Sequence, residues 1–231
     1  FHRIGVRILR THGDLVGVPK GFVIYDSDDQ KAMVARTIEA AGFSKDRYEP
    51  KALQGFINRA KQRGLTPDEV AAEDAIDPKD PWLTIYAAYE VAMRGAGAVD
   101  FSDLLMLPLR IMETQPLVRS EYKHRWRYVL VDEFQDTNLV QYRFLMAILN
   151  DAKRICVVGD DDQSIYRWRG AEVENILGFD RALPEVTVIR LERNYRCSGN
   201  ILDVATALIS QNRTRHAKAL WTDNPPGDPV Q

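Results

Sequence analysis

Apolar side chains between residues 26 and 98 recur every three or four positions, which is the spacing of amphipathic helices and not the alternation of strands. Pro50 and the run Thr66-Pro67-Asp68-Glu69 are suited to helix starts, while Gly42 and Gly64 are suited to helix ends. We therefore predict an all-helical unit over residues 26–98, with helices over 27–41, over 51–63, from residue 66 onward and over 82–94.

Another helical pattern precedes this unit. Residues 1–10 place Val6 and Leu9 on one face and three arginines on another, where they could meet a phosphate backbone or simply face solvent. The run Phe22–Tyr25 is then expected to be extended. Within the helical unit, three aromatic residues fall at helical spacing, so we expect them in the core and not in a binding site: Trp82, Tyr86 and Tyr89.

Beyond a linker at residues 95–98, apolar runs alternate with helical patterns. Helices are expected over residues 100–112 and from residue 116 to 122. Three apolar runs follow, and each is trailed by a helical segment: Tyr128–Val131, Ile155–Val158 and Val186–Leu191. Their near-continuous apolar character is typical of strands in a parallel sheet that is covered on both faces. The predicted fold class is therefore α/β, with a parallel sheet and an inserted all-helical subdomain.

Composition limits the function classes. A chain of 231 residues, 45% of them hydrophobic, can bury a core in one or two domains. Its formal net charge of −2 argues against a strongly basic coat for nucleic acid, although local basic patches are compatible with it. The chain has two cysteines, no apolar run of membrane-spanning length and no signal peptide, so we expect a reducing, cytoplasmic location.

Carboxylates follow the first predicted strand directly. Asp132 and Glu133 would lie at the carboxyl end of that strand, where parallel sheets bind ligands. One carboxylate can hold Mg²⁺ while the other orients or deprotonates an attacking water. Alternatively, the pair merely caps the next helix, because acidic side chains are stabilised at helix N-termini.

The ends of the other two predicted strands also carry polar and aromatic groups. Gln163 follows the second strand, where its amide could contact a phosphate oxygen, and Tyr166, Trp168 and Arg169 mix aromatic and cationic groups that suit unpaired bases. The alternative is that Tyr166 and Trp168 belong to the core. The third strand ends near Tyr195 and Arg196. The Tyr195 ring could stack on a base, and the Arg196 guanidinium could donate two hydrogen bonds to a terminal phosphate.

Taken together, these strand ends closely resemble the superfamily 1 DNA helicases of the UvrD/Rep/PcrA group. DEFQDTN is similar to helicase motif II, GDDDQSIYRWRGA to motif III and LERNYR to motif IV, in the family's order and spacing. FHRIGVRILR at the start and VDFSDLL at residues 99–105 also match family segments. The resemblance covers essentially the whole chain.

The resemblance implies roles for individual residues, with ATP and Mg²⁺ as cofactors. Asp132 would hold Mg²⁺, Glu133 would activate water, and Gln163 and Arg196 would contact the γ-phosphate, while Tyr195 would stack on adenine. Single-stranded DNA would lie along Tyr166, Trp168 and Arg169, together with Phe1 and His2. The implied activity is ATP-driven 3′-to-5′ movement on single-stranded DNA, with unwinding at junctions with duplex DNA during repair or replication.

The resemblance also implies a division into parts: residues 1–25 and 99–196 would belong to a first RecA-like (P-loop NTPase) domain, 26–98 to its helical insertion and 197–231 to a second RecA-like domain. No Gly-Lys pair occurs in the chain, so it contains no Gly-x-x-x-x-Gly-Lys-Ser/Thr phosphate loop. We expect the loop before Phe1 and most of the second domain after Gln231, which would leave these residues inactive alone. A non-catalytic DNA-binding or regulatory module that retains the fold is the alternative.

Overall fold

The structure is a computed structural model that describes residues 1–231 except 167–169, 184, 213–214, 216–217 and 231. It separates into two compact units. The first comprises Phe1–Leu130 and Asn138–Cys156, and the second comprises Val131–Thr137 and Val157–Gln231. The four-part division expected from the sequence stays a prediction.

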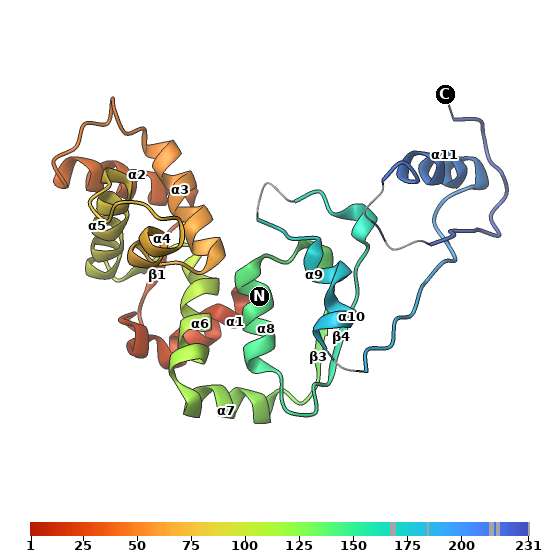
Figure 1. Ribbon diagram of the computed structural model, residues 1–231, viewed down its shortest axis with the longest axis horizontal. Coiled ribbons are helices and arrows are strands. Elements are labelled where there is room, and N and C mark those ends of the chain that lie inside the picture. Colours follow the sequence, from red (N-terminus) through yellow and green to blue (C-terminus); the bar gives the residue numbers. More distant parts are fainter. Residues whose placement is uncertain (167–169, 184, 213–214, 216–217, 231) are drawn as a thin grey trace. The chain divides into compact units, whose positions relative to one another are not determined.

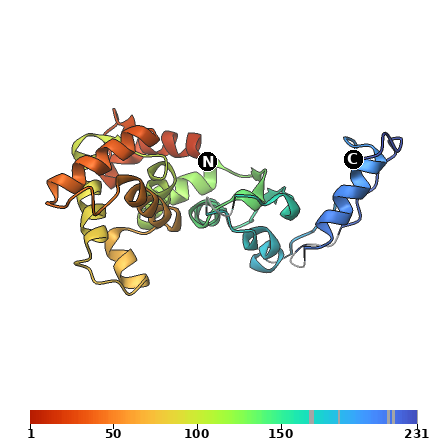
Figure 2. The same ribbon diagram turned by 90° about the horizontal axis from the view of Figure 1, so that it is seen from above.

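Four helices of the first unit occupy the segment that the sequence predicts to be all-helical, called the helical subdomain below, and they lie together in both ribbon views (Figure 1, Figure 2). The predicted capping box is present, since the Thr66 hydroxyl accepts the Glu69 N–H and the Glu69 carboxylate accepts the Thr66 N–H. Asp26 caps the first helix, because its side chain accepts the Asp28 and Asp29 N–H groups. Their bounds confirm the predicted spacing: α2 (Ser27–Ala40), α3 (Pro50–Arg63), α4 (Pro67–Glu73) and α5 (Pro81–Gly95).

The core of this subdomain contains the aromatic residues that the spacing placed there. Tyr86 and Tyr89 are fully buried, and Trp82 packs edge-on against Phe56. The Tyr86 hydroxyl donates to the Leu65 carbonyl at 2.9 Å, which satisfies its polar end inside the core. The prediction that these rings are structural is therefore confirmed.

A buried charge cluster joins α3 and α5 to the start of α6 (Asp103–Thr114). The Lys61 ammonium is fully buried and lies 2.7 Å from carboxylate oxygens of Glu90, Asp100 and Asp103. The Tyr89 hydroxyl also donates to Asp100. Burial alone would lower the pKa of Lys61, but the three carboxylates raise it well above its usual value, so the ammonium stays charged.

The other helices of the first unit pack around α6. It contacts α1 (His2–His12) on one side and α8 (Leu139–Ile148) on another, and α7 (Pro116–Arg125) follows it. Gly5 permits the contact between α1 and α6, because a Cβ there would lie 1.8 Å from the Leu104 carbonyl oxygen. Near the start of this unit, a 3-10 turn, η1 (Gly13–Val16), leads toward the first strand.

Two short parallel strands were only partly anticipated. β1 (Val23–Ile24) lies in the predicted extended run, and it pairs with β2 (Ala98–Val99), with Val23 opposite Ala98 and Ile24 opposite Val99. The expectation of a linker over residues 95–98 was therefore wrong at both ends, because Gly95 is the last residue of α5 and Ala98 is the first residue of β2. A strand of two residues is too short to show any periodicity in the sequence.

The second sheet contains β3 (Val129–Val131) and β4 (Ile155–Val157), and the boundary between the units crosses both strands. The Val129 N–H donates to the Arg154 carbonyl, and the Val158 N–H donates to the Val131 carbonyl, so the strands run in the same direction. The predicted α/β class with parallel strands is confirmed. The prediction that the sheet is covered on both faces is not confirmed, because the Leu130 side chain on β3 is 80% exposed.

The third predicted strand is absent from the described structure. Residues 186–191 form no helix or strand, no described strand pairs with them, and Ile189 and Leu191 are 76% and 80% exposed. Apolar composition alone does not make a strand, because the backbone groups also need a neighbour with which to pair.

In the second unit, the buried ring of Phe134 meets the Phe179 ring edge-on. Near the chain's end, the Asn194 and Trp221 N–H groups donate to the Trp221 and Glu192 carbonyls, which pairs two extended segments. No helix within the described residues has the length and apolar character needed to cross a membrane. The short elements of this unit are η2 (Phe134–Asp136), η3 (Asp161–Gln163), α9 (Glu174–Leu177), α10 (Phe179–Ala182) and α11 (Gly199–Ile209).

Candidate functional site

The acidic pair lies in a tight turn after β3. Asp132 and Glu133 are both exposed, and an Asp132 carboxylate oxygen accepts the Glu133 N–H at 3.0 Å. Glu133 has φ +52° and ψ +44°, the left-handed region that costs a residue with a Cβ about 1–2 kcal/mol. The buried Phe134 anchors the turn, because its N–H donates to the Val158 carbonyl at 3.0 Å. Backbone strain of this kind is concentrated at functional sites in proteins.

Gln135 connects this turn to the end of β4. Its side chain is buried, and its amide Nε2 donates to a Glu133 carboxylate oxygen at 2.7 Å. Its Oε1 accepts the Asp160 N–H at 3.0 Å. Gln135 has no role that the sequence predicts, because neither its burial nor its partner 25 residues away follows from local spacing.

Gly159 lets the two strand ends approach each other. A Cβ at this position would lie 2.5 Å from Gln135 Oε1 and 2.8 Å from Ile176 Cδ1, closer than side-chain atoms tolerate. The glycine is therefore required by close packing, since its φ angle is one that other residues also adopt.

Gln163 lies on η3, where it is exposed and donates to an Asp160 carboxylate oxygen at 2.7 Å. The Lys218 ammonium also contacts Asp160, together with Asp161 and Asp162. Partial burial acts to raise the pKa of Asp160, but hydrogen bonds from Lys218 and Gln163 lower it below its usual value. Arg215 adds a second cation, 2.7 Å from Asp162, so the acidic run is largely neutralised within its own unit.

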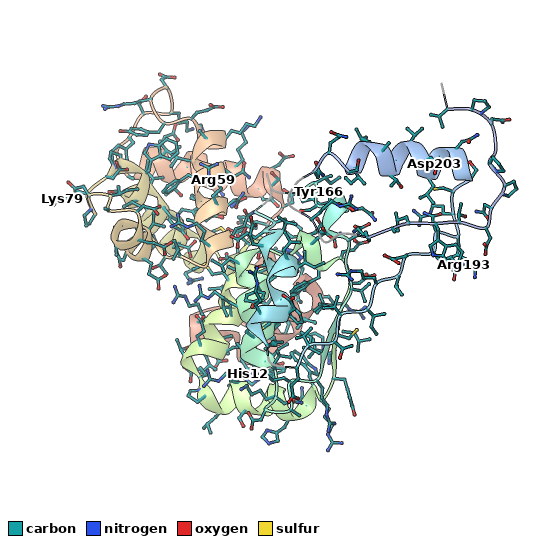
Figure 3. The ribbon with its side chains drawn as sticks, turned by 45° about the vertical axis from the view of Figure 1, so that its right-hand side comes forward. His12, Arg59, Lys79, Tyr166, Arg193 and Asp203 are labelled. Atoms are coloured by element: carbon teal, nitrogen blue, oxygen red, sulfur yellow. The ribbon has the colours of Figure 1, made fainter. Side chains whose placement is uncertain are left out.

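Tyr195 and Arg196 lie on an exposed segment of the same unit. The Tyr195 side chain is 75% exposed, and the Arg193 guanidinium, labelled in Figure 3, covers its ring at 4.7 Å. Arg193 also lies 5.2 Å from the Trp221 ring and forms an ion pair with Asp223. Arg193 and Trp221 were not predicted from the sequence, because the contact between them joins segments that are far apart along the chain.

The structure connects some of the predicted site residues and not others. Glu133 is linked through Gln135 to Asp160, and Asp160 contacts Gln163. Arg196 is exposed, and within the described part of the chain no hydrogen bond or ion pair joins it to Glu133 or Gln163. Its backbone N–H donates to the Asn194 side chain at 2.9 Å.

The predicted DNA contacts are described only in part. Tyr166, labelled in Figure 3, is half-buried in the second unit, whereas Trp168 and Arg169 lie outside the described residues. In the first unit, Phe1 lines a small apolar hollow beside Leu104 and Pro108. His2 lies edge-on to Phe101 at 6.1 Å, and burial followed by the nearby N-terminal charge lowers its pKa.

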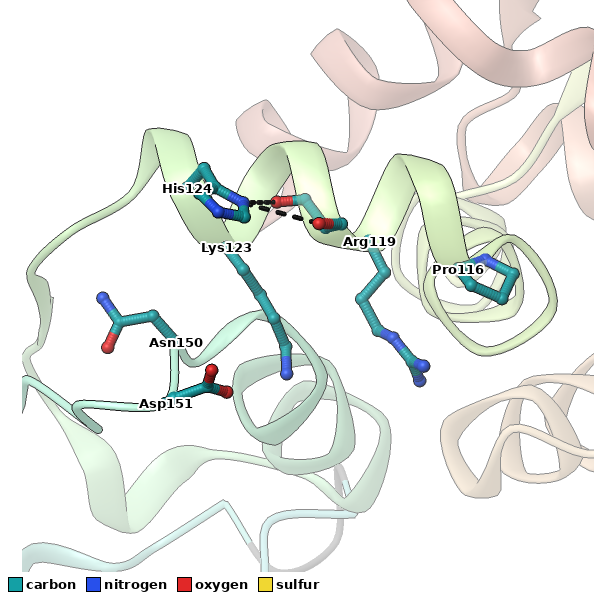
Figure 4. A pocket seen from close by; sticks show the side chains of 7 residues that line it. Pro116, Arg119, Lys123, His124, Asn150 and Asp151 are labelled. Carbon is teal, nitrogen blue, oxygen red and sulfur yellow. Dashed lines mark hydrogen bonds between the residues drawn. The ribbon is translucent and has the colours of Figure 1, made fainter.

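A separate hollow of about 290 Å³ lies in the first unit between α7 and the loop after α8. Arg119 and Lys123 extend from α7 on the same side as Asn150 and Asp151 (Figure 4). The His124 ring lies nearby, hydrogen-bonded at 2.7 Å to the Ser120 carbonyl one helical turn earlier. None of the predicted site residues lines this hollow.

The chemistry of the turn fits a magnesium nucleotide. Mg²⁺ prefers oxygen ligands and is commonly held by one or two carboxylates together with substrate phosphates and water. Asp132 offers an exposed carboxylate, with one oxygen oriented by the Glu133 N–H. Among the residues that the structure describes, no group of three or more His, Cys, Asp or Glu side chains forms an all-protein metal cage.

A parallel pair of strands with carboxylates and an amide at its carboxyl edge is typical of α/β nucleotide-binding proteins. Comparison with known families is more specific. A family model described as the UvrD/REP helicase N-terminal domain matches residues 1–184, and the chain belongs to this family.

Individual relatives align with this chain over its whole length. It is 42% identical over 231 residues to DNA helicase II of Haemophilus influenzae and 40% identical over 231 residues to DNA helicase II of Escherichia coli. It is 39% identical over 232 residues to the ATP-dependent DNA helicase PcrA of Leuconostoc citreum. These alignments cover 100% of this chain but only 31%, 32% and 31% of the relatives, so the chain spans about a third of their length.

Proposed function

We propose that this chain is part of a cytoplasmic ATP-dependent DNA helicase that moves 3′ to 5′ on single-stranded DNA and unwinds duplex at junctions during repair or replication. The observation that carries the proposal is the bonded series Glu133–Gln135–Asp160–Gln163 at the ends of two parallel strands. The relatives' names, DNA helicase II and ATP-dependent DNA helicase PcrA, support the same activity.

The acidic turn would perform the chemistry of ATP hydrolysis. Asp132 would hold Mg²⁺, which neutralises charge on the transferred phosphate when it is bound. Glu133 would orient the attacking water and take its proton, a role that needs a carboxylate within hydrogen-bond reach of that water. The exposure of both side chains leaves them accessible to the nucleotide.

Gln163, Tyr195 and Arg196 would complete the nucleotide site. Gln163 would exchange its bond to Asp160 for one to the γ-phosphate. Arg196, whose side chain is exposed, would stabilise charge that develops on that phosphate, an effect worth roughly 10³–10⁵ in rate in phosphoryl-transfer enzymes. Tyr195 has one ring face against Arg193, so adenine would stack on the other face.

Aromatic and cationic side chains would hold single-stranded DNA. Tyr166, Trp168 and Arg169 would stack on bases and contact phosphates, and Phe1 and His2 would contribute from the first unit. Base stacking on aromatic rings is worth roughly 1–3 kcal/mol per base and tolerates any sequence, as a translocating protein requires.

The proposal is tested in the full-length protein by phosphate release with and without single-stranded DNA. A second assay measures strand displacement on duplexes with a 3′ or a 5′ single-stranded tail. We expect DNA-stimulated ATP hydrolysis and displacement that requires the 3′ tail. Hydrolysis without any DNA dependence, or DNA binding without hydrolysis, would instead support the non-catalytic module.

A further inference from the structure

We propose that Gln135 is a positioning residue that fixes the Glu133 carboxylate and ties it mechanically to the segment 160–163. The inference rests on the proposed ATPase function and adds the route by which that site is regulated. Gln135 itself would not touch nucleotide, because its side chain is buried and both ends of its amide are occupied by protein groups.

The orientation of the Gln135 amide is determined by its partners. A carboxylate only accepts hydrogen bonds, so the Glu133 oxygen at 2.7 Å requires the amide NH₂. A backbone N–H only donates, so the Asp160 N–H at 3.0 Å requires the amide oxygen. Rotating the amide by 180° would break both bonds at once, and its burial keeps competing water away.

The left-handed backbone of Glu133 places its carboxylate beside Gln135. Residues two apart in a helix do not face each other. Here the turn brings the Glu133 carboxylate back over the start of η2, and Gln135 holds it at one oxygen. The other oxygen carries no bond to a described residue, so it remains available to a water.

Gln135 contacts the segment 160–163 at Asp160, just after the end of β4. Asp160 donates its N–H to Gln135 while its carboxylate accepts from Gln163 and from the Asp162 N–H. Gly159 allows this approach, because any Cβ would strike Gln135 Oε1. Gln163 would release Asp160 when it binds a phosphate, and DNA would displace the residues that follow Gln163. Either event would move the Asp160 backbone. Because Gln135 is bonded to both residues, this movement would shift the Glu133 carboxylate.

The test uses the full-length protein with two variants that remove different bonds. Gln135→Met keeps the length of the side chain and loses both bonds. Gln135→Glu keeps an acceptor for the Asp160 N–H but replaces the donor toward Glu133 with a second carboxylate oxygen. Gln141→Met is the matched control, because Gln141 also bonds through its amide oxygen at 2.9 Å, to the Asn138 N–H at the start of α8.

We expect both Gln135 variants to lower the DNA-stimulated kcat on the order of 10²-fold, as misplacement of a catalytic group by about 1 Å does. The KM for ATP and the affinity for a labelled single-stranded oligonucleotide should stay near wild type, because neither binding surface includes Gln135. Gln141→Met should keep wild-type kcat.

Three outcomes would overturn the inference. One is wild-type kcat in either Gln135 variant. Another is a loss of kcat that only matches the loss of folded protein, measured by near-ultraviolet circular dichroism and the melting temperature. The third is an equal loss in Gln141→Met. If Gln135→Met does not fold, Gln135→Glu decides alone, since it retains the bond to Asp160. Absence of DNA-stimulated hydrolysis in the wild type would refute the proposed function instead.

Discussion

Each carboxylate of the acidic turn has a different hydrogen-bond partner. An Asp132 oxygen accepts the Glu133 N–H, whereas a Glu133 oxygen accepts from the Gln135 amide. Their neighbour Asp136 differs from both. Burial and then the Glu133 charge raise its pKa, and one of its oxygens is buried with no hydrogen-bond partner among the described residues.

In the full-length protein, Glu133→Gln should retain binding of Mg²⁺-ATP and of DNA while kcat falls roughly 10²–10⁴-fold, the usual contribution of a general base. The amide still accepts a hydrogen bond from Gln135 but cannot take a proton from water. Calorimetry with ATP and a phosphate-release assay measure the two effects. Glu121→Gln, which changes an exposed glutamate on α7, serves as the control. Comparable turnover in Glu133→Gln and wild type would refute the assignment.

Individual elements are joined by the charge cluster around Lys61. Its ammonium comes from α3, Glu90 comes from α5, and Asp100 and Asp103 surround the start of α6. Removing one partner of a buried ion cluster is costly, because the remaining charges lose their compensation in a medium that solvates them poorly.

Lys61→Met should therefore lower the free energy of unfolding of this chain by roughly 3–5 kcal/mol. Urea denaturation followed by far-ultraviolet circular dichroism measures the change. Lys51→Met removes an exposed lysine from the same helix and should change stability by less than about 0.5 kcal/mol. Equal destabilisation by the two substitutions would show that the buried ion cluster does not contribute to the free energy of unfolding.

The same cluster predicts a dependence of stability on pH. Burial and the neighbouring Asp100 carboxylate raise the pKa of Asp103 from 3.8 to about 7, against the opposing effect of Lys61. Between these values the unfolded chain has lost the proton that the folded chain keeps. Stability contributed by this group is therefore full below pH 3.8 and is lost as the pH rises toward 7. Urea midpoints between pH 4 and pH 8 should show this loss in wild type, and Asp103→Asn should remove it.

Helix boundaries could be predicted from the sequence, because caps act over three or four residues. Thr66 with Glu69, Pro50 and Gly64 all lie where local chemistry put them. Val186–Leu191 has the composition of a strand but lacks a described partner, so a local pattern was misleading. The acidic pair was singled out from its position after a strand together with the family resemblance, and its role stays a prediction. Gln135 and Arg193 were not singled out, since their contacts involve Asp160 and Trp221, which are distant along the chain.

At the scale of the whole molecule, the 231 residues lack a phosphate loop, because they contain no Gly-Lys pair. Such a loop supplies backbone N–H groups and a lysine to the β- and γ-phosphates. We expect this chain by itself neither to bind Mg²⁺-ATP at micromolar concentration nor to release phosphate, with or without single-stranded DNA. Calorimetry and phosphate release on the purified chain test this, and DNA-stimulated release by the chain alone would contradict it.

The buried cluster at Lys61 also constrains how this sequence can evolve. A single substitution at position 61 leaves three acidic groups without their cation, and a substitution of one acid alters the balance for the others. Replacing a whole buried ion cluster with apolar residues of similar volume is often neutral or stabilising. Substitutions at positions 61, 90, 100 and 103 should therefore occur together during evolution. Related sequences should either retain all four charged residues or have replaced all four.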